Sequence, residues 1–356
     1  MKFIDLDTQY NLIKKDLNKR LNRIFKKKDF ILGKEVTELE KNLSNISKFK
    51  YVETCANGTD ALSLSIKTLL KDSKNQYILV PNFSYIASAE VIPLNGHIPV
   101  FIDVKEDFTI SFDAIEKAFL YLKKKNKKIS TIIGVDLFGY ECEHKKIYNF
   151  CKRNKIKYII DGAQSFTSFY HVKTQARNCD IWCTSFFPSK SLGCYGDGGA
   201  VFTNNYKYAK YINALKKHGV TNPKKKMLHQ IIGVNSRLDT IQAAVINAKL
   251  KILYSEFKKK LKIFDKLRLI INNDNYFTPK QNRFILPTVY TIICKDIKSL
   301  NNLKLKYKPN AHYYPNILSE QCAFKKSKKI VFSFKRSKQF SKKVLSIPYH
   351  PYLKIK

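Results

Sequence analysis

Short, nearly continuous apolar runs recur through the first two thirds of the chain. They read QYILVPNF, HIPVFIDV, STIIGVDLFG, KYIIDGAQ, IWCTSFF and GGAVFT. A strand buried on both faces needs such a run, because neither face meets water. The pattern therefore predicts the strands of a central, mostly parallel sheet.

Apolar residues at helical spacing lie before and after these runs. The two repeats near the start consist of Ile13, Leu17, Leu21 and Ile24, and of Val36, Leu39, Leu43 and Ile46. After NSRLD a longer amphipathic pattern begins, with Ile241, Val245, Ala248 and Ile252. Helices alternating with buried strands predict the α/β class. Near residue 245 the rhythm changes, so we expect a large domain over 1–245 and a smaller α+β domain over 246–356.

The composition fits such a globular chain. Of 356 residues, 44% are apolar, and no apolar run approaches the roughly 20 residues of a membrane span. The start, MKFIDLDTQY, has two Asp and no apolar signal core, so we expect a cytoplasmic protein without membrane insertion. The eight Cys form no CxxC pair, which favours reduced thiols and no metal site.

The formal net charge of +38 raises the possibility of a nucleic-acid partner. Only eight of the 66 basic residues are Arg, and Lys runs such as YLKKKNKKI and EFKKKLK are scattered along the chain. Sequence-specific readers rely on Arg gathered at one surface. We therefore expect no specific nucleic-acid function, while weak attraction to polyanions stays open.

One lysine has unusual neighbours. In TSFFPSKSLGCYGDGGAVFTN, Lys190 stands among aromatics, glycines and small hydroxyls, and Asp197 is the only other charged residue. Desolvation lowers the pKa of a lysine toward the range in which its amine is a nucleophile. The stretch therefore predicts a reactive amine just after a strand.

Three further motifs follow strands or open helices, where open parallel sheets bind ligands. In ANGTD, Gly58 and Thr59 precede a helical run, which suits a phosphate or an ordinary capped helix. In KYIIDGAQ, Asp161 ends a buried strand, where it needs a cation or hydrogen bonds. In GVNSRLD, Asn235 and Arg237 precede the long helix, and a helix cap formed by Ser236 or Asp239 is the simpler alternative.

The order of these parts matches pyridoxal phosphate chemistry, in which the cofactor supplies the electron sink. The chain resembles the sugar-nucleotide aminotransferases of the DegT/DnrJ/EryC1/StrS family over nearly its whole length. The motifs that carry the resemblance are FIDLDTQY, FILGKEVTELE, ANGTDAL, VPNFSYIASAE, DGAQSF, SFFPSKSLGCYGDGGA, GVNSRLDTIQAA and LSIPYHPYL. The resemblance implies the fold type I aminotransferase architecture.

The resemblance also assigns roles around the cofactor, pyridoxal 5'-phosphate. It implies that Lys190 forms a Schiff base with it, that Asp161 pairs with its ring nitrogen, and that Gln164 binds its ring hydroxyl. Tyr85 would stack on the ring. The phosphate would be held by Gly58, Thr59, Ser185 and, from a second subunit, Asn235. The active unit would therefore be a homodimer with shared sites.

The implied reaction transfers an amine from L-glutamate to a keto-sugar nucleotide. The wording of two motifs is closest to the branch that aminates UDP-2-acetamido-2-deoxy-3-oxo-glucuronate for surface polysaccharide precursors. Substrate contacts would come from Phe30, Arg237, Tyr313 and Tyr314, but Phe30 and Tyr313 replace the Tyr and His usual in that branch.

Those two departures keep a 4-keto-6-deoxy nucleotide sugar open as the alternative substrate. A catalytically inactive regulatory or nucleic-acid-binding protein of the same fold is the alternative of another class. The intact pair of Lys190 and Asp161 argues against that class. The family usually continues past PYL with a closing helix, so we expect the smaller domain to lack its last helix.

Overall fold

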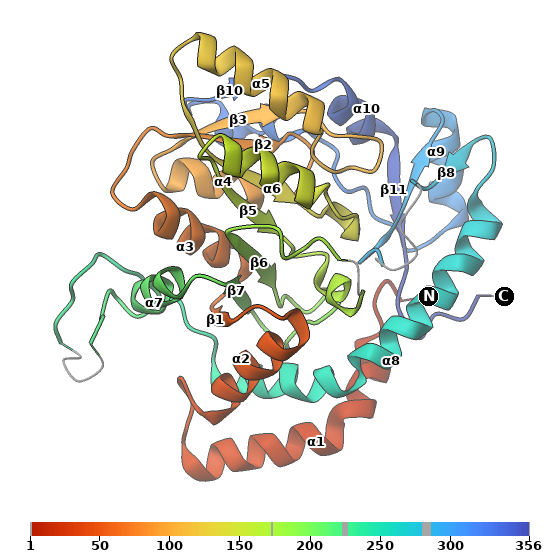
Figure 1. Cartoon of the computed structure of the whole chain (residues 1–356). Helices are drawn as coiled ribbons and strands as arrows, with labels where there is room; N and C mark the ends of the chain where they lie inside the picture. The colour runs from red at the N-terminus through yellow and green to blue at the C-terminus, as the bar shows by residue number, and fades with distance from the viewer. Residues whose placement is uncertain (1, 172–173, 223–226, 280–285, 356) are drawn as a thin grey trace.

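An eight-stranded sheet runs through the centre of the molecule in the computed structural model, which describes residues 2–171, 174–222, 227–279 and 286–355 (Figure 1). Its strand order is β1-β7-β6-β5-β4-β2-β3-β10. The strands are β1 (Tyr51–Cys55), β2 (Tyr77–Pro81), β3 (Ile98–Ile102), β4 (Ile129–Val135), β5 (Lys157–Asp161), β6 (Ile181–Ser185), β7 (Gly199–Thr203) and β10 (Ile330–Val331).

The sheet is mostly parallel, as the apolar runs predict. From β6 to β10 all neighbours are parallel, and only β7 runs antiparallel to both of its neighbours. All six predicted strands are present. The strands β1 and β10 were not predicted.

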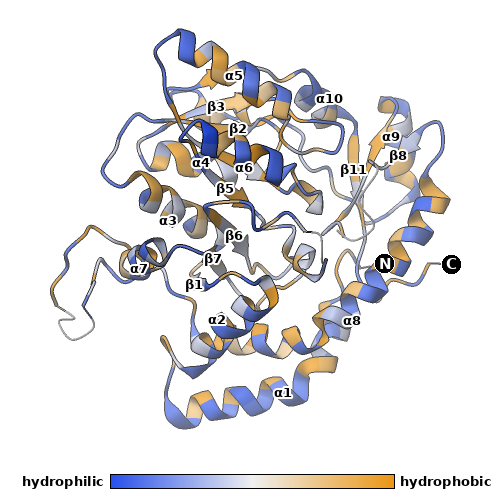
Figure 2. Cartoon of the chain, viewed as in Figure 1, coloured by the Kyte–Doolittle hydropathy of each residue, from blue (hydrophilic) through white to orange (hydrophobic). Residues whose placement is uncertain are grey.

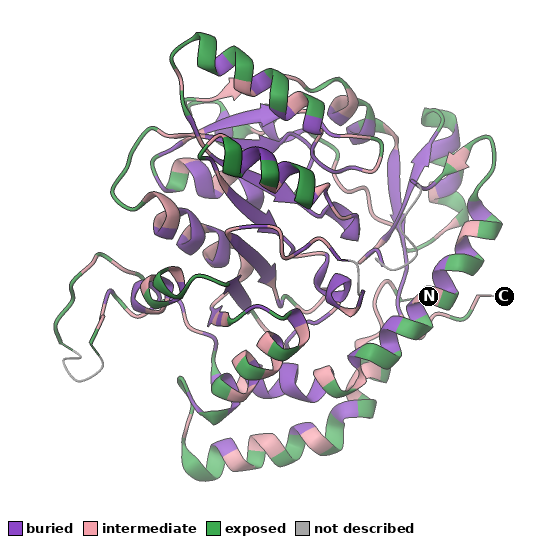
Figure 3. Ribbon diagram, viewed as in Figure 1, coloured by how far each residue is buried: buried purple, intermediate pink, exposed green. Residues whose placement is uncertain are grey.

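Helices cover both faces of the sheet, because side chains alternate across each strand. In β5, Tyr158 and Ile160 join one core cluster, whereas Ile159 joins the other. The first cluster includes side chains of α2 (Lys34–Ser47), α5 (Phe112–Lys124), α6 (His144–Arg153) and the first part of α8 (Thr240–Ile271). The second includes side chains of α3 (Gly58–Leu70), α4 (Ala87–Leu94) and α7 (Tyr206–Leu215). Figure 3 shows the strands buried between these layers.

The amphipathic patterns at 13–24 and 36–46 form α1 (Leu6–Lys27) and α2, as predicted. Ile13, Leu17 and Ile24 of α1 pack against α8, and hydrophilic residues alternate with the apolar ones along both helices (Figure 2). Among the described residues, no helix combines the length and apolar character needed to cross a bilayer.

A second, antiparallel sheet of order β11-β9-β8 lies beside the far end of α8. It comprises β8 (Tyr276–Phe277), β9 (Tyr290–Cys294) and β11 (Val344–Ile347), accompanied by α9 (Ile297–Lys306) and α10 (Lys335–Lys343). Along α8, Leu253 belongs to the core of the large sheet and Phe257 to the core of the small one. One continuous helix thus joins the two parts, and the division at residue 245 stays a prediction.

Candidate active site

A cavity of about 450 Å³ opens where β2, β4, β5 and β6 end. Nine of the twelve residues predicted from the sequence line it. They are Gly58, Thr59, Tyr85, Asp161, Gln164, Ser185, Lys190, Tyr313 and Tyr314. Predicted residues up to 256 positions apart in sequence, from Gly58 to Tyr314, therefore converge on one site, as expected for the carboxyl edge of a parallel sheet.

Lys190 extends into this cavity from a tight turn after β6. The turn is closed by a hydrogen bond of 2.9 Å from the Lys190 N–H to the carbonyl of Phe187. Burial lowers the pKa of the Lys190 amine, and the nearby Asp161 carboxylate only partly opposes this effect. Within the described part of the chain, no hydrogen bond or ion pair occupies its Nζ, so the amine is available to a ligand.

Asp161 is the last residue of β5 and is 6% exposed. Its Oδ2 accepts a hydrogen bond of 2.7 Å from the Ser88 hydroxyl, and its Oδ1 accepts one of 3.1 Å from the Ala163 N–H. Burial raises the pKa of Asp161, while these two hydrogen bonds oppose the rise. A cationic group that enters the cavity would stabilise this buried carboxylate.

The start of α3 forms an anion cradle beside Lys190. Asn57 caps the helix, its side chain accepting a hydrogen bond of 2.7 Å from the Asp60 N–H. The N–H groups of Gly58 and Thr59 remain at the positive end of the helix dipole. A Cβ at Gly58 would lie 2.7 Å from the Ser185 Cβ, so glycine lets the Ser185 hydroxyl reach the same point. ANGTD is therefore both a capped helix and an anion cradle.

Aromatic rings close another wall of the cavity. Tyr314 lies 6.1 Å from Tyr85 between ring centroids, and it is stacked at 6.3 Å on Phe138. Gln164 Oε1 accepts a hydrogen bond of 2.6 Å from the Phe138 N–H. Burial raises the pKa of Tyr314, and its hydrogen bond with the Gln164 side chain opposes the rise. Gln164 thus connects the large sheet to the loop that carries Tyr313 and Tyr314.

The other three predicted residues do not line the cavity of their own chain. Phe30 is 41% exposed, Asn235 is exposed, and Arg237 is partly buried. Nor does the simpler interpretation of GVNSRLD hold in full. Ser236 accepts a hydrogen bond of 3.1 Å from the Ala56 N–H, and Asp239 stands at the N-cap of α8 without a side-chain cap bond.

Several residues of the site escaped the sequence analysis. Ser88 holds Asp161 from the first turn of α4, Phe138 contributes a ring, and Thr288 donates a hydrogen bond of 2.6 Å to the Gln164 carbonyl. A small hydroxyl inside a helix has no pattern that distinguishes it. Phe138 lies at the end of the apolar run STIIGVDLFG, a pattern that indicates a strand and does not mark a site residue.

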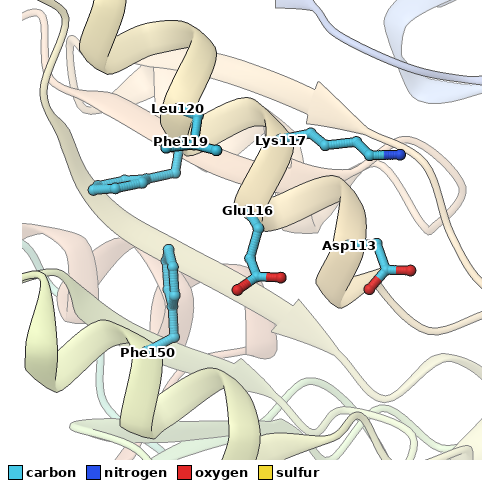
Figure 4. Close-up of a pocket in the computed structure, with 6 residues that line it drawn as sticks. All are labelled: Asp113, Glu116, Lys117, Phe119, Leu120 and Phe150. Atoms are coloured by element: carbon cyan, nitrogen blue, oxygen red, sulfur yellow. The ribbon is translucent and has the colours of Figure 1, made fainter.

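Two other features are weaker candidates for a site. Asp136, Cys142 and His144 lie close enough to suggest a metal site, but the Asp136 carboxylate is already engaged within the fold. It lies 2.9 Å from His144 Nε2 and accepts hydrogen bonds from the Cys142 N–H and the Ser165 hydroxyl. A hollow of about 490 Å³ lies between α5 and α6, where Asp113, Glu116 and Lys117 line it beside Phe119, Leu120 and Phe150 (Figure 4). It shares no lining residue with the cavity at Lys190.

Comparison with known proteins agrees with this geometry. The model of the DegT/DnrJ/EryC1/StrS aminotransferase family matches residues 11–356. The UDP-2-acetamido-2-deoxy-3-oxo-D-glucuronate aminotransferase of Pseudomonas aeruginosa is 35% identical over 99% of this chain and 96% of its own length. A pleiotropic regulatory protein of Geobacillus stearothermophilus is 30% identical over 99% of this chain and 94% of its own length.

Solved structures show the same architecture. A DegT DnrJ EryC1 StrS aminotransferase from Brucella abortus superposes with a TM-score of 0.90 at 32% identity, covering 99% of this chain and 95% of that one. NtdA from Bacillus subtilis with bound cofactor PMP superposes with a TM-score of 0.84 at 23% identity, covering 95% of this chain and 78% of that one. At this identity the similarity shows the fold alone. The predicted fold class and family resemblance are confirmed.

Proposed function

This chain belongs to the DegT/DnrJ/EryC1/StrS aminotransferase family, whose members depend on pyridoxal phosphate, and we propose that it transfers the amine of L-glutamate to a 3-keto nucleotide sugar. The observation that carries the proposal is the unpaired Lys190 amine in one cavity with the buried Asp161 carboxylate. A lysine that only interacts with solvent would not be buried in a cavity beside a carboxylate.

The residues fit pyridoxal phosphate group by group. The buried Asp161 carboxylate matches a protonated ring nitrogen, and the start of α3 with Ser185 matches the phosphate. The exposed ring of Tyr85 offers a stacking surface, and Gln164 a donor for the ring hydroxyl. When bound, the cofactor supplies an electron sink for the carbon that gains or loses the amine.

The chain's own residues supply position and proton transfer. Asp161 would hold a positive charge on the ring nitrogen, because a buried carboxylate favours a cation beside it. The lowered pKa of Lys190 leaves its Nζ unprotonated nearer to neutral pH. Nζ would therefore take the proton from the donor carbon and, in the second half of the reaction, deliver a proton to the sugar carbon that receives the amine. Positioned acid–base catalysis of this kind contributes roughly 10²–10⁴ in rate.

A second copy of the chain completes the proposed site. The described residues on either side of 223–226 extend away from the body in Figure 1, and among them Met227 and Ile232 are apolar and each 91% exposed. Asn235 and Arg237 follow it without lining their own cavity. We infer that in a homodimer they reach the partner's cavity, where Asn235 meets the phosphate and Arg237 the acidic substrate.

The sugar is proposed from the relative in Pseudomonas aeruginosa: UDP-2-acetamido-2-deoxy-3-oxo-glucuronate or a similar 3-keto sugar, for a surface polysaccharide precursor. One observation favours the 4-keto-6-deoxy alternative. Among the described residues that line the cavity, Lys190 is the only cation, and Tyr313 replaces the His of that branch. A uronate carboxylate therefore depends on Arg237 of a second copy.

Two measurements test the proposal. Purified protein should carry a yellow cofactor that bleaches when L-glutamate is added, and borohydride should attach the pyridoxyl group to the peptide containing Lys190. A label on another peptide, or none, contradicts the assignment. A panel of 3-keto and 4-keto nucleotide sugars, with and without a carboxylate at C6, then identifies the acceptor.

A further inference from the structure

A second, smaller chamber of about 60 Å³ adjoins the cavity at Lys190. The two spaces share Ile4, Ser189, Lys190 and Thr288. The chamber is enclosed by α8, by the segment 4–9 and by Tyr349–Tyr352, consistent with the two chain ends lying close together in Figure 1. A water needs about 10–15 Å³ measured this way, so the chamber has room for a carboxylate group but not for a sugar.

Lys260 of α8 lines this chamber and is 8% exposed. Its Nζ donates a hydrogen bond of 3.0 Å to the Pro287 carbonyl and lies 4.4 Å from the centre of the Tyr349 ring. No described carboxylate lies within 4.0 Å of it. Burial lowers the pKa of Lys260 to about 7, although Glu256 opposes the shift.

Another buried lysine, Lys216, has carboxylates beside it that compensate its charge. Lys216 is 1% exposed, and its Nζ lies 2.8 Å from Glu53 Oε2 and 3.5 Å from Glu40 Oε1. Its pKa is raised because these carboxylates outweigh the effect of burial. Lys260 lacks such partners, so its charge is uncompensated.

Two described carboxylates line the chamber, Asp5 and Glu256, and both are already engaged. Asp5 caps α1 by accepting hydrogen bonds from the N–H and the hydroxyl of Thr8. Glu256 accepts hydrogen bonds of 2.9 and 3.1 Å from Gln9 Nε2, and a further one from the Tyr352 hydroxyl. It lies one helical turn from Lys260 on α8, yet forms no ion pair with it. Glu256 therefore fastens the two chain ends to α8 and leaves Lys260 unpaired.

His350 adds a second polar group, whose ring forms a hydrogen bond with the Lys2 backbone but keeps one nitrogen unpartnered. Its ring lines the chamber, is 7% exposed, and has no hydrogen-bond partner for Nδ1 among the described residues. A buried ammonium and a buried imidazole nitrogen around a chamber of this size suit one anionic oxygen group.

We propose that this chamber binds a carboxylate, that of the amine donor, through Lys260 and His350. The inference rests on the proposed function for the identity of the donor. A donor must bring its amine to the Lys190 side of the cavity, and its carboxylate then enters the adjoining chamber, whose wall includes Lys190. The sugar nucleotide stays in the larger cavity, so the two substrates depend on different residues.

Thermal unfolding of the holoenzyme in sodium acetate, against sodium chloride at equal ionic strength, tests the site without turnover. We expect acetate to raise the midpoint of the wild type, of Lys260→Arg and of Lys258→Met, a charge-matched control at an exposed position of the same helix. Lys260→Met and His350→Gln should lose the response. Acetate stabilisation that survives in Lys260→Met overturns the site.

Steady-state kinetics then assign the carboxylate to the donor. Lys260→Met should raise the KM for L-glutamate by about tenfold or more, and leave the KM for the keto sugar unchanged. Loss of the acetate response with an unchanged KM for L-glutamate overturns the donor assignment in favour of a free small carboxylate. If the wild type does not use L-glutamate, the proposed function fails, while the acetate experiment still decides the site.

Discussion

Ser88 Oγ donates a hydrogen bond of 2.7 Å to Oδ2 of Asp161, so α4 holds the carboxylate at the end of β5. Ser88 is 1% exposed, and its hydroxyl lies 3.1 Å from that of Ser84. The hydrogen bond favours the ionised carboxylate against the effect of burial. The position and the charge of Asp161 therefore both depend on Ser88. In the proposed binding of pyridoxal phosphate, Ser88 itself does not contact the ring nitrogen.

Ser88→Ala should weaken the binding of pyridoxal phosphate about 10–100-fold, because a hydrogen bond to a charged group contributes roughly 1.5–3 kcal/mol. The readout is the dissociation constant of the cofactor, measured by absorbance. Ser84→Ala is the matched control, since it removes a hydroxyl four residues earlier that contacts Ser88 but not Asp161. Equal losses in both variants would contradict the role of Ser88.

Asp161→Asn keeps the shape of the side chain and its acceptor oxygen but removes the charge. Losing one partner of a buried ion pair costs about 3–5 kcal/mol, so cofactor affinity should fall by about 10²–10³-fold or more. The pKa of Lys190 should fall further, because Asp161 is the group that opposes its lowering. The measurement is the pH dependence of pyridoxal phosphate capture by the cofactor-free protein. A midpoint above that of the wild type contradicts the coupling.

Most of the sheet and its α/β class followed from the sequence, because a strand buried on both faces must be apolar along its whole length. The strand β10 is only two residues long, and no periodicity reveals so short an element. The antiparallel direction of β7 depends on the turn at Lys190, which no apolar pattern encodes.

The side chains of the site were predictable only where a motif marks them. Lys190 and Asp161 stand out by their neighbours, whereas Lys260 lies in the run FKKKLK among exposed lysines. Its burial follows from the packing of Tyr349 and the chain ends on α8. Asn235 and Arg237 do not line the cavity of their own chain, and the sequence of one chain cannot predict which surface of a second copy they would reach.

Buried lysines should make stability depend on pH. Burial lowers the pKa of Lys260 to about 7 and that of Lys249 to about 8, from 10.5. Between pH ~7 and ~10.5 the unfolded chain then binds more protons than the folded one, so these groups make folding more favourable as pH rises. The destabilisation of the fold by these two buried amines is largest below their folded-state pKa values and disappears above pH ~10.5.

In chloride buffer, Lys260→Met should therefore have a higher unfolding midpoint than the wild type at pH ~6–7, and the gap should close toward pH ~10. Lys258→Met, an exposed change on the same helix, should show no such trend. Differential scanning calorimetry across this range provides the measurement. A gap that widens with pH would mean that the Lys260 amine is not destabilised by burial.

Shared sites should reveal themselves by complementation. Asn235→Ala and Lys190→Ala homodimers should each have little activity. If Asn235 serves the partner's cavity, a mixed dimer contains one site with both defects and one intact site, so an equal mixture refolded together should recover about a quarter of the wild-type activity. Lys190→Ala mixed with Asp161→Asn is the control without recovery, because both residues line the cavity of their own chain and every site keeps one defect. No recovery in the first mixture would place Asn235 in its own subunit's function.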